Sequence, residues 1–73
     1  MAETVLATFR QRLAQALAAD PRSRAQIARE AGYYAGHIRR IVKGDRRSPT
    51  LEFAEAMAGA LNVSLAWLLG FED

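Results

Sequence analysis

Apolar residues recur at helical spacing along this chain, and no segment of any length alternates in the manner of a β-strand. Near the N-terminus the positions that share this spacing are Val5, Phe9, Leu13, Ala16 and Leu17. Intervals of three and four residues place such side chains on one face of a helix. We therefore expect a first helix from about Thr4 to Ala19. It would end before Pro21, because a proline pushes the preceding residue out of helical geometry.

A second and a third helix are predicted close together. The second would span residues 24–31 and begin at a capping box, Ser23-Arg24-Ala25-Gln26, in which a Ser N-cap is followed three residues later by Gln. It would end at Gly32, where a helix terminus favours a left-handed residue. The third would span residues 35–43. Two short helices with a glycine-led turn between them have the layout of a helix-turn-helix, here over about residues 23–43.

The predicted third helix has two chemically different faces. Its apolar residues Ile38, Ile41 and Val42 fall together on one side. The opposite arc, about 140° wide at 100° per residue, carries Ala35, Gly36, Arg39, Arg40 and Lys43. The first face can pack against a core. The second can lie against a polyanion and bring its backbone close to it.

Two further helices are expected after a polar, turn-rich connection that runs from Gly44 to Pro49. Thr50 would cap the fourth, and Asn62 would end it. Its apolar stripe would consist of Leu51, Ala54, Met57, Ala58 and Leu61. Ser64 would cap a short fifth helix over residues 65–69. The predicted fold is all-α, a compact five-helix bundle that forms one domain over residues 1–73.

The charge of the chain is modest overall but concentrated. Eight of the ten Lys and Arg residues lie between Arg22 and Arg47, a window that holds only two acids, Glu30 and Asp45. Such a basic stripe is typical of a surface that binds phosphate, although a solvated charged face is the simpler alternative. The absence of cysteine rules out disulfides and thiolate metal sites.

Other function classes find little support in the sequence. No apolar run is long enough to span a membrane, and the N-terminus lacks the features of a signal peptide, so we expect a cytoplasmic protein. A serine-histidine-acid site would need His37, the only histidine, which lies on the third helix. No glycine-rich phosphate loop follows a strand. We expect neither an enzyme nor a cofactor, a metal or a small-molecule effector.

The chain resembles the phage lambda repressor and Cro type of helix-turn-helix domain, also called the xenobiotic-response-element family, over roughly residues 10–69. The segments that carry the resemblance are Gln26 to Gly32, Ile38 to Gly44, Ser48 to Leu51 and Ala60 to Leu65. The resemblance implies a homodimer that binds a palindromic operator in double-stranded DNA and represses transcription. It also implies a bacterial or phage protein, associated with the nucleoid when bound. The chain would be either a whole regulator or the DNA-binding half of a longer repressor.

The resemblance assigns roles by position. Ala35, Gly36 and Arg40 would face base edges. Arg24, Lys43 and the loop residues Arg46 and Arg47 would lie along the phosphate backbone. Two of the three base-facing positions depart from the family pattern, because Gln or Ser is common where this chain has Ala35 and Gly36. Another departure is Val42, which stands where many members carry an acid that pairs with an arginine of the first helix.

Several of these residues have competing interpretations. Arg40 can bind guanine O6 and N7 through its two terminal nitrogens, or form a surface salt bridge with an acid such as Glu30 or Glu55. Arg39 suits a base or a phosphate equally. Small size at Gly36 would allow close approach to DNA, or a packed bundle simply tolerates it.

The aromatic residues near the turn are equally open to interpretation. Tyr34 is a candidate for a phosphate contact through its hydroxyl group, whereas Tyr33 stands where the family has an apolar side chain. His37 falls at the edge between the two faces of its helix, where it would either donate to a phosphate or pack.

Large apolar residues crowd the C-terminal end. Leu65, Leu68 and Leu69 suit the core, and Trp67 and Phe71 would remain partly exposed. The alternative is a two-fold interface, to which we assign Trp67, Leu68 and Phe71. A second function class also remains: a protein-interaction module, either an adaptor or the antitoxin partner of a toxin, whose basic face binds an acidic protein.

Overall fold

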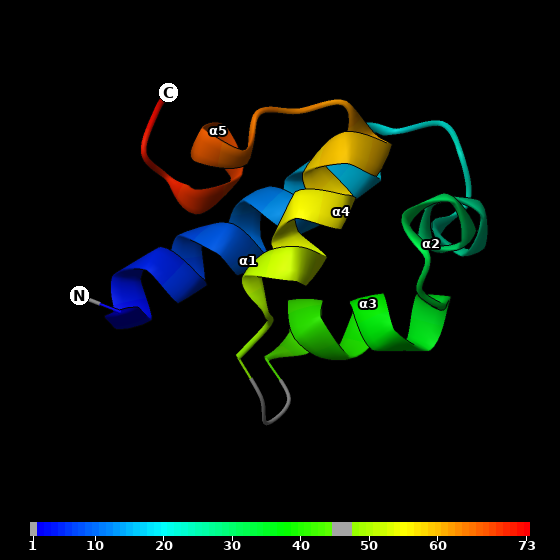
Figure 1. The fold of residues 1–73 in the computed structure, drawn as a ribbon, viewed down its shortest axis with the longest axis horizontal. Coiled ribbons are helices and arrows are strands. Elements are labelled where there is room, and N and C mark those ends of the chain that lie inside the picture. The colour runs from blue at the N-terminus through cyan, green and yellow to red at the C-terminus, as the bar shows by residue number, and fades with distance from the viewer. Residues whose placement is uncertain (1, 45–47) are drawn as a thin grey trace.

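The computed structural model describes residues 2–44 and 48–73, and this part of the chain forms five helices. They are α1 (Ala2–Ala19), α2 (Arg24–Ala31), α3 (Ala35–Lys43), α4 (Leu51–Leu61) and α5 (Leu65–Leu69). Figure 1 shows α4 crossing α1, with α3 along one edge of the molecule and α5 at the opposite edge. The all-α prediction is confirmed. None of the helices in the described residues combines the length and apolar character needed to cross a bilayer.

Local side chains begin three of these helices as expected. The hydroxyl groups of Ser23, Thr50 and Ser64 each accept a hydrogen bond from the backbone N–H three residues later, at 3.0–3.1 Å. Each such cap contributes about 1 kcal/mol. At α2 only the Ser23 half of the expected capping box forms, because the Gln26 side chain donates to the Glu30 carboxylate instead, 3.5 Å away.

Left-handed residues end the helices at the predicted places. Gly32 has φ 87° and Asn62 has φ 59°, both in the left-handed region. After Gly32 the chain turns sharply, and the N–H of Tyr33 donates to the carbonyl of Ala28 at 2.8 Å. This pattern of hydrogen bonds satisfies carbonyls that the helix end leaves unpaired. It sets the direction in which α3 leaves α2.

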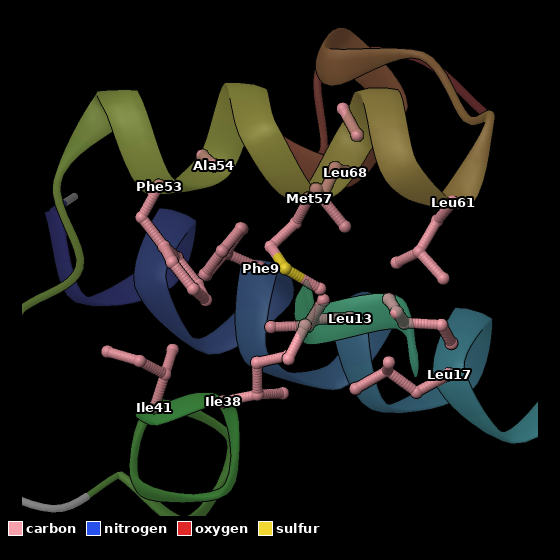
Figure 2. Close-up of a cluster of buried hydrophobic side chains, with 13 residues drawn as sticks. Phe9, Leu13, Leu17, Ile38, Ile41, Phe53, Ala54, Met57, Leu61 and Leu68 are labelled. Carbon is pink, nitrogen blue, oxygen red and sulfur yellow. The ribbon is translucent and has the colours of Figure 1, made fainter. Parts of the chain in front are cut away.

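The core receives side chains from all five helices and is entirely apolar among the described residues. Its members are Phe9, Leu13, Leu17, Ile27, Ala28, Ile38, Ile41, Phe53, Ala54, Met57, Ala58, Leu61 and Leu68. Figure 2 shows the α1 residues of this cluster facing those of α4, with Ile38 and Ile41 entering from α3. Complete burial of a large aliphatic or aromatic side chain contributes about 1.5–3 kcal/mol, so this cluster is the main source of stability.

The apolar stripe of α4 differs from the prediction. Leu51, which we expected in the core, is 63% exposed, whereas Phe53 is 1% exposed and packs edge-on against Phe9. At 100° per residue, the buried positions of α4 cover an arc that begins at Phe53 and ends at Ala58. Leu51 falls just beyond this arc and in the first turn of the helix, so its side chain remains in solvent.

Candidate nucleic-acid interface

Helix α3 is anchored by its apolar face and leaves its polar face open. Ile38 and Ile41 are 0% and 5% exposed, and Val42 packs against the same core. On the other side Arg39, Arg40 and Lys43 are exposed, while Ala35 and Gly36 are half-buried. Figure 1 shows α3 at the edge of the molecule, with the other helices on one side of it. The two-faced character that the sequence predicted for this helix is confirmed.

The cations on the exposed face of α3 and at the start of α2 form no ion pairs with acids among the described residues. Within residues 2–44 and 48–73, Arg24, Arg39, Arg40 and Lys43 make no ion pair. The salt bridge considered between Arg40 and Glu30 is therefore absent there. Arg46 and Arg47, which we expected on the phosphate backbone, lie outside the described residues.

Arg22 belongs to the framework and not to the basic surface. Its guanidinium group donates to the Asp20 carboxylate at 2.7 Å, to the Glu30 carboxylate at 2.6 Å and to the Ala60 carbonyl at 2.7 Å. The hydrogen bonds from Arg22 lower the pKa of Asp20 from 3.8 to about 2. The basic stripe predicted between Arg22 and Arg47 is thus narrower than the sequence suggested, since its first cation is already paired.

Arg10 holds the C-terminal end of α3, a role that the sequence analysis missed. Its Nε donates to the carbonyl of Ile41 at 3.1 Å, and that carbonyl also accepts from the N–H of Gly44 at 3.2 Å. Position 42 is Val and not an acid, and the arginine of α1 binds the backbone of α3. The departure at Val42 was the only sign of this arrangement in the sequence.

Aromatic rings support the N-terminal end of α3. The rings of Tyr33 and His37 stack with centroids 5.1 Å apart and 17° between their planes. Both meet Phe53 edge-on, at 4.9 Å and 5.1 Å respectively. Of the two roles considered for His37, the packing contact is observed, and the phosphate contact stays a prediction. Tyr34, by contrast, is 60% exposed.

The start of α3 also differs from the starts of the other described helices that follow a loop. Its N-cap residue, Tyr34, has extended backbone angles, with φ −125° and ψ 158°, and provides no side-chain acceptor. The first N–H groups of α3 therefore have no capping side chain, unlike those of α2, α4 and α5. Unpaired N–H groups at a helix start can donate hydrogen bonds to an anion such as a phosphate.

The C-terminal residues divide between the core and the surface. Leu68 is 0% exposed, so its side chain belongs to the core, and its assignment to a dimer interface stays a prediction. Trp67 is half-buried beneath the guanidinium group of Arg12, whose Cζ lies 5.1 Å from the ring centroid. Phe71 is 70% exposed. Of the three residues assigned to the interface, Phe71 has the largest exposed fraction.

No group of three or more His, Cys, Asp or Glu side chains in the described residues is arranged to hold a metal ion.

Comparison with known proteins places these features in a family. No curated protein and no solved structure matches the chain. A helix-turn-helix family matches residues 22–68, which include α2, α3 and α4 and most of α5, more than half of the chain. The chain therefore belongs to the helix-turn-helix family of the lambda repressor and Cro type, whose domains are DNA-binding transcription regulators.

Proposed function

We propose that this protein represses transcription by inserting α3 into the major groove of an operator. The observation that carries the proposal is the exposed face of α3, where Arg39, Arg40 and Lys43 are free of ion pairs among the described residues. An α-helix fits the major groove of B-DNA, and cations on its outer face neutralise phosphates as it enters. The apolar face fixes the helix on the core, so the cations are presented by a rigid element.

The proposed roles follow from chemistry and position. Arg40 contacts guanine through two nitrogens, the commonest specific contact in the major groove. Arg39 contacts a neighbouring base or a phosphate. Lys43 binds a phosphate near the C-terminal end of α3, and Arg24 binds one at the start of α2. The base contact would provide sequence recognition, and the phosphate contacts would provide affinity that does not depend on sequence.

We further propose that the protein binds as a homodimer to a palindromic site. Two-fold symmetry would set two copies of α3 about 34–36 Å apart, one turn of duplex. The support for association comes from Phe71, a large apolar side chain that is 70% exposed and lies two residues beyond the end of α5.

The proposal is tested by selecting bound sites from a random duplex library and then measuring affinity for the best site at several salt concentrations. If about 4 to 6 phosphates are neutralised by each subunit, log affinity should fall against log salt with a slope of about −4 to −5 per subunit. A slope shallower than about −1, or no binding to any duplex at low salt, would contradict the proposal. The second result would favour an acidic protein as the partner.

Two substitutions separate specificity from affinity. Arg40→Ala should weaken binding to the best site by about 1–3 kcal/mol and relax the preference at one base pair. Lys43→Ala should weaken binding to all duplexes similarly and make the salt slope shallower by about 1. Arg29→Ala, which removes an exposed cation of α2 to which we assign no contact, is the charge-matched control. Equal losses on selected and random DNA for Arg40→Ala would contradict its assignment to a base.

A further inference from the structure

The first turn of α3 lacks side chains that could distinguish one base from another. Ala35 ends at a methyl group, and Gly36 has no side chain at all. The space above Gly36 is nevertheless filled. A Cβ atom on Gly36 would lie 2.9 Å from Cε2 and 3.2 Å from Cδ2 of Tyr34. The aromatic ring of Tyr34 therefore covers the surface where a side chain at position 36 would stand.

Tyr34 is held in this position although most of it is exposed. Its ring lies 6.1 Å from that of His37, with 54° between the planes, and His37 is itself fixed between Tyr33 and Phe53. The exposed fraction of Tyr34 is 60%, so the outer side of the ring is accessible. A side chain that is already in place loses less entropy when it binds than one that moves freely.

The chemistry of this ring suits one feature of the major groove. Thymine is the base that presents an apolar group there, its 5-methyl group, and proteins recognise it by apolar contact. Contact with a phosphate would use only the Tyr34 hydroxyl group and would not require the ring to cover Gly36. The position of the ring on the first turn of α3 favours contact with a base edge.

We propose that Tyr34 reads a thymine methyl group in the major groove, in place of a side chain at position 36. This proposal rests on the proposed insertion of α3 into that groove. It gives Gly36 a second explanation, since a side chain at this position would displace the Tyr34 ring. Gly36 is then a positioning residue, and Tyr34 is the residue that touches the base.

The test replaces each thymine of the selected half-site with uracil, which removes only the methyl group. One position should weaken binding of the wild type about fourfold, the value of one buried methyl group. Tyr34→Phe should keep this sensitivity, because the ring remains. Tyr34→Ala should abolish it at the same position, so that thymine and uracil bind equally well.

Gly36→Ala tests the positioning role with little risk to the fold. Alanine favours helix, and the ring that it would displace is 60% exposed, so the ring moves into solvent and not into the core. This variant should lose sensitivity at the same thymine as Tyr34→Ala does. Gly59→Ala is the matched control, because a Cβ on Gly59 meets nothing within 4 Å in α4, and it should keep the wild-type profile.

Two results would overturn the proposal while leaving the proposed function intact. The first is a selected half-site without thymine. The second is a uracil profile that is the same for Tyr34→Ala and the wild type. If Tyr34→Phe also weakens binding to every duplex, the Tyr34 hydroxyl group contacts a phosphate instead. If the wild type binds no duplex at all, both proposals fail together.

Discussion

At the scale of single residues, Arg22 joins three parts of the fold that are distant in sequence. Its guanidinium group connects the segment after α1, through Asp20, to α2, through Glu30, and to the last turn of α4, through the carbonyl of Ala60. The planar fork of arginine suits such multiple acceptors better than an ammonium group would. Because the folded protein lowers the pKa of Asp20 to about 2, the contact depends on pH.

Asp20 should make stability sensitive to acid. A carboxyl group whose pKa is lowered by folding stabilises the protein above its ordinary pKa of 3.8, and this contribution is lost as the pH falls from about 4 to about 2. Asp20→Asn should therefore be less stable than the wild type at pH 7, and the difference should shrink over that window. Urea unfolding followed by circular dichroism at each pH measures this.

The control for this experiment is Glu55→Gln. Glu55 is exposed and forms no ion pair among the described residues, so the variant should follow the wild-type profile. A constant difference between Asp20→Asn and the wild type from pH 7 to pH 2 would mean that the lowered pKa is not a property of the folded state.

At the scale of helices, contacts between residues close in sequence could be predicted, whereas contacts between residues distant in sequence could not. The N-caps Ser23, Thr50 and Ser64 could be predicted because each binds an N–H only three residues away. The arginines that bind carbonyls near the ends of α3, α4 and α5 could not, because their partners lie 31, 38 and 55 residues away. Such contacts depend on how the helices cross, which periodicity alone does not give.

The contact between Arg10 and α3 leads to a prediction about this element. Arg10→Met should lower the free energy of unfolding by about 1–2 kcal/mol, because the Ile41 carbonyl loses a charged donor. It should also weaken binding to all duplexes without changing base preference, since it loosens the end of α3 and not a reading residue. Urea unfolding and binding to selected and random DNA measure both effects.

Gln11→Met is the control for this variant, because it places the same side chain at a neighbouring, exposed position of α1. Its stability should stay within about 0.5 kcal/mol of the wild type. A change of base preference in Arg10→Met would mean that Arg10 affects the reading residues themselves.

At the scale of the whole molecule, the proposed reading surface and the proposed association surface are separate. Figure 1 shows α3 and α5 at opposite edges, with α1 and α4 between them. The sequence predicted the five helices and the cationic face of α3, because both depend on helical period. It did not predict that the Tyr34 ring covers Gly36, because this depends on three-dimensional contacts.

Phe71 provides the sharpest test of the dimer. Phe71→Ser should leave the free energy of unfolding within about 0.5 kcal/mol of the wild type, because the side chain is 70% exposed. It should lower affinity for an operator with two half-sites much more than for a single half-site, which serves as the internal control. Trp67→Ala is less informative, since Trp67 also packs against the core and Arg12.

Sedimentation of the wild-type complex completes this test. At protein concentrations that saturate the operator, the dimer requires two chains per duplex. A complex with one chain per duplex would contradict it.

The contact between Arg12 and Trp67 has a practical consequence. Trp67 is the only tryptophan in the chain, and Arg12 connects it to α1 by a hydrogen bond to the carbonyl of Trp67 and by a cation–π contact with its ring. The protein therefore carries its single tryptophan fluorophore in α5, at the edge opposite α3 (Figure 1), where it can be excited selectively over the two tyrosines. Its emission reports the detachment of α5 or the arrival of a neighbouring subunit, and it is distant from the bases that α3 would contact. A titration followed by tryptophan fluorescence could thus measure assembly separately from sequence recognition.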